Sequence, residues 1–136
     1  MSNPYLQMLP KPPAEDKREA VEALRLFAAA LQDYPGRGKD VEVDVAVYQE
    51  GATEQDSRVQ ITVYVPKTDY VNIVLVARCT GNDGFPVKID PYFAGGSFPN
   101  GFPPCQDRQQ LDDSLRRFAQ SPEMLSLLEY MRKHAR

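Results

Sequence analysis

The chain has 136 residues, a length that suits one domain with a single hydrophobic core and no need of disulfide or metal staples. Its formal net charge of −3 and pI near 5.2 exclude a general attraction to nucleic acid or to an anionic membrane. No apolar run approaches the roughly 20 residues of a membrane-spanning helix, and the first residues lack the apolar centre of a signal peptide. We therefore expect one cytoplasmic domain, residues 1–136, with no membrane association.

The chain has few residues that could bind a metal ion or form a disulfide. The chain has two cysteines, Cys79 and Cys105, far apart in sequence, and one histidine, His134. A structural zinc site needs about four ligands, so we predict neither a metal nor a cofactor. Both thiols are expected to be reduced, and a disulfide between them is the less favoured alternative.

The first segment in chain order is an arm rich in proline, residues 1–13, whose apolar side chains either lie along the domain or reach for a partner. A helix is predicted next, since Pro12 and Pro13 suit its first turn and Tyr34-Pro35-Gly36 suits its end. Its apolar positions repeat at three and four residues, at Ala20, Leu24, Phe27, Ala28 and Leu31.

Alternating valines predict a strand over Val41–Tyr48, and Arg58–Val65 alternates in the same way. The segment Val71–Ala77 is apolar on both faces, as in a central strand, and a fourth strand is predicted after the turn Thr80–Gly84. Matching the apolar faces gives an expected register with Val47 opposite Val59, Ile61 opposite Leu75, Val63 opposite Ile73 and Cys79 opposite Phe85.

Two helices complete the predicted fold. Asp107 with Gln110 resembles a capping box, and Ser121-Pro122 starts a second helix. We predict an α+β domain of order α-β-β-β-β-α-α, in which a four-stranded antiparallel meander packs its Val and Ile face against an N-terminal helix and two C-terminal helices.

The stretch PYFAGGSFPNGFPP, residues 91–104, is aromatic and carries no charge. Such a loop either folds over the edge of a core or forms a binding surface. The prediction leaves both roles open.

Few residues are candidates for catalysis. Cys105 precedes a predicted helix N-terminus, which can lower a thiol pKa, but no histidine is near it in sequence. His134 lies near a helix end and is expected to be solvated. Gly95-Gly96-Ser97 lacks the lysine and spacing of a phosphate loop, and Glu42 with Asp44 is expected to be a solvated face with Arg58 as cross-strand partner. We expect no catalytic residue.

Basic side chains concentrate in the last two helices. They are interleaved with acids, and no nucleic-acid motif accompanies them, so nucleic-acid binding is the least favoured function.

An apolar binding surface is the favoured interpretation. Val74 and Val76 are expected to face away from the main core, beside Thr62 and Gln60. With the aromatic loop they predict a site for a protein partner or for a second copy of the chain. The predicted binding residues are Tyr64, Val74, Val76, Tyr92, Phe93, Phe98 and Phe102.

The favoured function is thus a non-catalytic interaction module, such as an adaptor, a chaperone-like binder or an inhibitor of the immunity type. The alternative is a small-ligand-binding domain or a small enzyme with a pocket under loop 91–104, near Asp90, Tyr92 and Cys105.

Overall fold

The computed structural model describes residues 17–36, 40–49, 56–90 and 93–134. Its elements, in order, are α1 (Glu19–Asp33), β1 (Glu42–Gln49), β2 (Ser57–Val65), β3 (Tyr70–Cys79), β4 (Val87–Asp90), α2 (Arg108–Ala119) and α3 (Pro122–His134). The predicted α+β fold and its α-β-β-β-β-α-α order are confirmed. The proline-containing arm, residues 1–13, lies outside the described residues.

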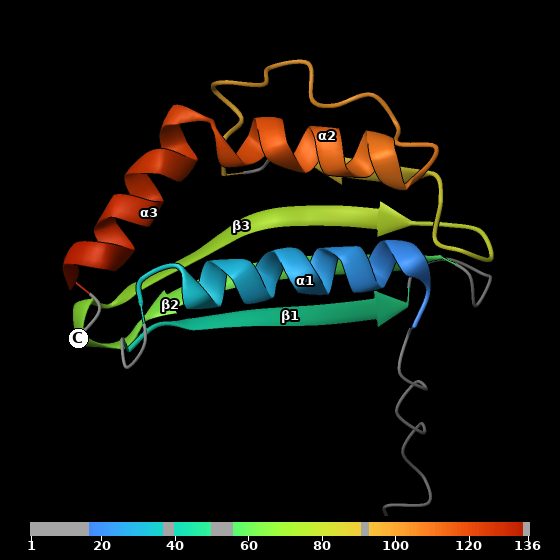
Figure 1. The fold of residues 1–136 in the computed structure, drawn as a ribbon. Helices are drawn as coiled ribbons and strands as arrows, with labels where there is room; N and C mark the ends of the chain where they lie inside the picture. The colour runs from blue at the N-terminus through green and yellow to red at the C-terminus, as the bar shows by residue number, and fades with distance from the viewer. Residues whose placement is uncertain (1–16, 37–39, 50–55, 91–92, 135–136) are drawn as a thin grey trace, which may run out of the picture.

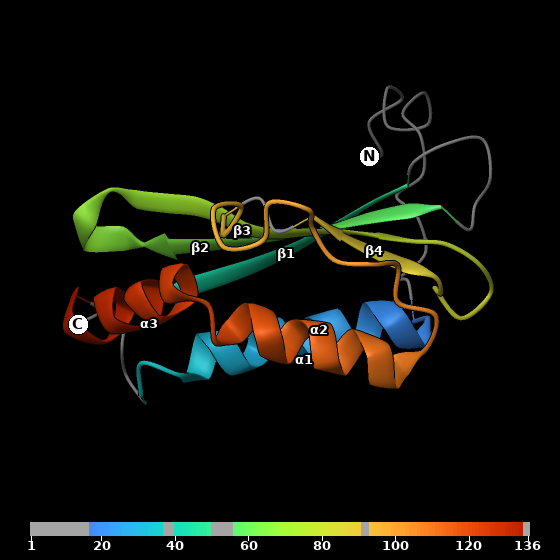
Figure 2. The same ribbon diagram turned by 90° about the horizontal axis from the view of Figure 1, so that it is seen from above.

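The strands form one antiparallel sheet in the order β1-β2-β3-β4. Helix α1 packs on β1 and β2 and lies beside α2, which in turn contacts α3 (Figure 1). Figure 2 shows that all three helices are on the same side of the sheet. Within the described ranges the other side of the sheet carries no helix, and we call it the open face.

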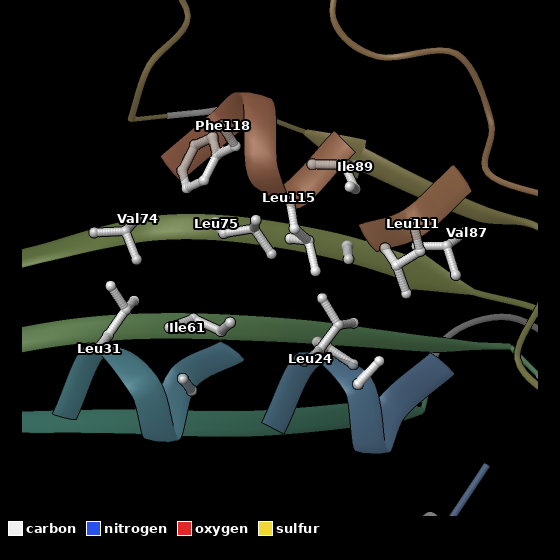
Figure 3. Packing of buried hydrophobic residues seen from close by; sticks show 14 of the residues in the cluster. Leu24, Leu31, Ile61, Val74, Leu75, Val87, Ile89, Leu111, Leu115 and Phe118 are labelled. Carbon is white, nitrogen blue, oxygen red and sulfur yellow. The ribbon is translucent and has the colours of Figure 1, made fainter. Parts of the chain in front are cut away.

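The core fills the space between the sheet and the helices. Leu24 and Leu31 of α1 meet Ile61 and Leu75 of the sheet, and Phe118 of α2 lies in the same cluster (Figure 3). Each of these side chains is at most 5% exposed. Burying one such side chain contributes about 1.5–3 kcal/mol, so this contact is the main source of stability for the sheet.

Helix α1 begins at Glu19, later than the prolines at 12 and 13 indicated. Lys17 and Arg18 are not helical, and the Arg18 guanidinium donates to the Gly81 carbonyl at 3.0 Å and to the Ser57 hydroxyl at 2.7 Å. The Ala20 amide donates to the Asp83 carbonyl at 3.1 Å. The start of the helix is therefore set by its docking on the β3–β4 turn, a tertiary contact.

Gln32 of α1 holds the start of the edge strand β1. Its side-chain amide donates to the Val41 carbonyl, and its Oε1 accepts from the Val43 amide at 2.7 Å. An amide that donates and accepts in this way replaces a missing neighbouring strand. Gln32 thereby satisfies two backbone groups at the edge of the sheet.

Replacing Gln32 with Leu is expected to destabilise the protein by about 1–3 kcal/mol, because both backbone groups lose their partner. Urea denaturation measures the loss, and hydrogen exchange at the Val43 amide locates it. The Gln109→Leu variant is the control, since Gln109 is exposed on α2 and its loss is expected to change stability by no more than about 0.5 kcal/mol. Unchanged protection of Val43 in the Gln32 variant would contradict this role.

The predicted register of the first strand pair is confirmed, with Val47 opposite Val59 and Val45 opposite Ile61. Ile61 also faces Leu75 as predicted, but the register shifts between Ile61 and Thr62. Thr62 then faces Ile73, so Val74 is an extra residue in β3, a β-bulge. The predicted pairing of Val63 with Ile73 is wrong, because Val63 faces Asn72.

The predicted start of β4 is wrong by two residues, since Cys79 faces Val87 and not Phe85. The Phe85 amide donates to the Asp83 carboxylate at 3.0 Å, and Pro86 has no amide hydrogen. Neither residue can therefore begin a ladder. Strand β4 begins at Val87 instead. On the side away from β3, the backbone of Val87 forms two hydrogen bonds of 2.8 Å with the backbone of Cys105.

Candidate functional site

The open face presents alternate residues of each strand, opposite to the residues that enter the core, except that the bulge in β3 turns both Val74 and Leu75 to the core. Its residues are Glu42, Asp44, Ala46 and Tyr48 of β1; Arg58, Gln60, Thr62 and Tyr64 of β2; Val71, Ile73, Val76 and Arg78 of β3; and Lys88 and Asp90 of β4. The two ends of this face differ in chemistry.

One end of the open face combines acidic and apolar side chains. Glu42 pairs with Tyr64 and Tyr64 with Val71, and in the next row Thr62 lies between Asp44 and Ile73. The two carboxylates are exposed, Tyr64 and Ile73 are half-buried, and Val71 is 60% exposed. We call Glu42, Asp44, Tyr64, Val71 and Ile73 the sheet patch. Arg58, the expected partner of the two acids, lies opposite Tyr48 instead.

Val74 does not lie on the open face, and the prediction that it does is wrong. The bulge turns Val74 to the helix side, where it is fully buried in the core. Val76 lies beyond the bulge and faces Gln60 on the open face, as predicted. Of the residues predicted to bind a partner, Tyr64 and Val76 thus stand on the open face.

The other end of the open face carries a row of cations. Arg58 faces Arg78 across β2 and β3, and Arg78 faces Lys88 across β3 and β4. The Arg58 guanidinium carbon lies 5.1 Å above the ring of Tyr48, within the range of a cation–π contact. We call Arg58, Arg78 and Lys88 the basic row.

A groove of about 480 Å³ lies along the basic row. Its lining residues are Arg58, Val76, Arg78, Lys88, Ile89, Asp90, Asn100 and Gly101. The groove is thus bounded by three strands of the sheet and by the loop that follows β4. The predicted alternative to a protein-binding surface was a pocket under this loop, near Asp90, Tyr92 and Cys105. Asp90 lines the groove and Cys105 does not.

The aromatic side chains of the loop point inward. Phe102 is 1% exposed and its ring centroid lies 4.6 Å from that of Phe98, while Phe93 packs against the core. The Arg117 guanidinium of α2 lies 5.3 Å from the centroid of Phe102 and 5.8 Å from that of Phe98. These contacts fasten the loop to the body of the protein, with Phe102 buried and with Phe93 and Phe98 half-buried. Tyr92 lies outside the described residues.

A second contact holds the same loop. Both carboxylate oxygens of Glu123 accept from the Ser97 hydroxyl, at 2.9 and 2.7 Å. This bond, together with a backbone hydrogen bond, lowers the pKa of the exposed Glu123 carboxyl below its usual value of 4.5. The Gly95-Gly96-Ser97 segment thus has a structural contact with α3.

The catalytic candidates are separated from one another. Cys105 is buried, and its sulfur lies 3.5 Å from the Ser114 hydroxyl of α2. His134 stacks on Tyr130 with a centroid distance of 4.4 Å, and Tyr130 stacks on Tyr70. Over the described part of the chain, no three His, Cys, Asp or Glu side chains gather as a metal site would require.

Several cations of α2 and α3 have carboxylate partners on their own helix. Arg108 lies 3.0 Å from Asp112, Arg116 lies 3.6 Å from Asp113, and Lys133 lies 3.1 Å from Glu129. This pairing reduces the positive field of the helices, which weakens the nucleic-acid alternative.

Sequence reasoning missed the basic row. The register predicted for β2 and β3 already set Arg58 opposite Arg78, so two of the three cations were predictable as neighbours. Lys88 was not predicted as the third cation, because the predicted start of β4 set Arg78 opposite Pro86 and not opposite Lys88. In the structure the pairing of β3 with β4 is shifted by two residues from the predicted register, and this shift places Lys88 opposite Arg78.

No protein family, no curated protein and no solved structure matches this chain. Among the described residues, no helix is both long enough and apolar enough to cross a bilayer.

Proposed function

We propose that this chain is a non-catalytic binding module that docks a protein partner on the sheet patch. The observation that carries the proposal is an exposed apolar surface bordered by carboxylates on a sheet face that no described helix covers. Exposed apolar surface next to polar groups is typical of protein interfaces. The module is of the adaptor or inhibitor kind.

The chemistry of the sheet patch defines the partner. Val71 and Ile73 call for an apolar side chain opposite them, and Glu42 and Asp44, both exposed, call for Lys or Arg at its rim. The partner is therefore a protein that presents apolar side chains flanked by basic ones. A second copy of this chain is the competing occupant, and the mass of the complex distinguishes the two.

A cytoplasmic location is part of the same proposal. Cys79 and Cys105 are both buried and neither forms a disulfide, which suits a reducing compartment. Fractionation of the cells that make the protein, followed by detection of the tagged chain, measures its location.

The Val71→Glu variant is expected to lose the partner, because a charge replaces apolar contact area at the most exposed apolar side chain of the sheet patch. The measurement is affinity purification of the tagged protein from its own cells after mild cross-linking, with quantification of each co-purified protein. We expect a stoichiometric partner with the wild type and at least a tenfold lower yield with Val71→Glu.

Leu125→Glu is the matched control. Leu125 of α3 is 56% exposed, close to the 60% of Val71, but it lies on the helix side of the sheet. It is expected to keep the partner. Equal yields from both variants, or a wild-type chain that stays monomeric without any stoichiometric partner, would refute this function.

A further inference from the structure

The basic row sets like charges directly opposite one another on neighbouring strands. Side chains in such positions have Cβ atoms about 4.5–5.5 Å apart, and like charges there destabilise a sheet. The arrangement stands out in a chain whose formal net charge is −3. The three side chains concentrate positive charge at this end of the open face, which favours an anionic ligand there.

The groove along the basic row has the size of a ligand site. Its volume of about 480 Å³ falls in the range of roughly 300–1,000 Å³ that is typical of small-molecule pockets. Val76 supplies apolar lining, and Asn100 supplies an amide that can donate and accept hydrogen bonds. The combination of cations, an apolar surface and one neutral polar group suits an organic anion better than a bare ion.

The loop side of the groove is held in place. Lys88 Nζ donates to the Phe102 carbonyl at 2.5 Å, and the Gly101 amide donates to the Phe98 carbonyl at 2.9 Å. Phe102 itself is buried. The site therefore needs little reorganisation on binding, which favours affinity. Lys88 uses one of its three ammonium protons in this bond and keeps its charge for a ligand.

We propose that this groove binds a small organic anion with two oxyanion groups, phosphate or carboxylate, that are shared among the cations of the basic row. Guanidinium groups bind both kinds of group through paired hydrogen bonds. The row spans two strand intervals, about 9–10 Å, so it accommodates two anionic groups more readily than one. Asp90 also lines the groove and opposes the ligand.

This site does not depend on the protein partner proposed above. The basic row and the sheet patch share no residue and lie at opposite ends of the open face. A result that refutes anion binding at the basic row therefore does not refute partner docking on the sheet patch, and the reverse also holds.

Pyrophosphate and citrate are the probes: pyrophosphate presents two linked phosphate groups without an organic part, and citrate presents carboxylates on a carbon skeleton. Isothermal titration calorimetry at fixed ionic strength measures affinity and stoichiometry, and backbone amide NMR shifts locate the site. We expect saturable binding of one equivalent of at least one probe, with the largest shifts at Val76, Asn100 and Gly101. The preferred probe identifies the natural anion as phosphate or carboxylate.

Three exposed positions give variants with different expected results. Arg78→Gln removes one cation of the row and is expected to weaken binding about tenfold or more. Asp90→Asn removes the opposing carboxylate and is expected to tighten binding. Arg132→Gln makes the same chemical change as the first variant on α3 and is expected to leave affinity unchanged.

Several outcomes would overturn the site. One is the absence of saturation with both probes at millimolar concentration, and another is equal affinity in the Arg78 and Arg132 variants. Binding that weakens in Asp90→Asn would also contradict the assignment. An acidic peptide that binds where neither small probe does would show that the groove serves a protein and not a small ligand.

Discussion

The Val74→Glu variant is expected to lose about 3–5 kcal/mol of stability, which is a large part of the total for a domain of this size. Val74 is fully buried among the core residues on the helix side of β3. A carboxylate at this position would be desolvated without a partner, and such burial is among the most costly single changes. Urea denaturation followed by circular dichroism measures the loss.

The same substitution at Val71 is the control. Val71 is also in β3, but it faces the open side and is 60% exposed, so Val71→Glu is expected to change stability by less than about 1 kcal/mol. An unbroken strand would set Val74 and Val76 on the same face, which is why this comparison tests the bulge. If Val74→Glu melts like the wild type, the bulge and the inward position of Val74 are both wrong.

Replacing Gly84 with Ala is expected to destabilise the protein by about 2–4 kcal/mol. Gly84 has a φ of +92°, a backbone conformation that residues with a side chain rarely adopt. A Cβ built there would also lie 2.7 Å from the Ala20 Cβ, well inside normal contact distance. Strain and overlap therefore act together at the point where α1 docks on the β3–β4 turn.

Two further variants separate these effects. Gly101 has a φ of +68° and an open space around the built Cβ, so Gly101→Ala is expected to show the strain alone, about 1 kcal/mol. Adding Ala20→Gly to the Gly84 variant removes the overlap and is expected to recover part of the lost stability, measured as a double-mutant cycle of unfolding free energies. Additive losses in that cycle would mean that the two residues do not touch.

The open face shows how one sheet can carry two kinds of surface. Strand β4 has four residues and reaches only the Val76–Cys79 part of β3, so the groove and its loop occupy that end. At the other end of β3, no described strand flanks the edge away from β2, and Val71 and Ile73 remain accessible there. The short fourth strand therefore contributes Lys88 to the basic row and stops before it reaches the sheet patch.

Periodicity and turn chemistry determined the elements of this protein. Alternating valines in β1 and β2 specify strands with one buried face, and the spacing of Leu24 and Leu31 specifies the inner face of a helix. Capping is equally local, as in α2, where the Asp107 carboxylate accepts from the Gln110 amide at 2.9 Å. Such features depend on neighbours in the chain, so the sequence by itself predicts them.

Tertiary packing alone decided the surfaces. Val74 belongs to an apolar run that suits either face, and the bulge that buries it arises from pairing with β2, not from its own neighbours in sequence. The loop aromatics turn inward because Arg117 and the core offer them contacts, and Lys88 joins the basic row because Phe85 and Pro86 cannot enter the ladder. Contacts between distant segments have no periodic signal, and for this reason the binding face could be predicted only in part.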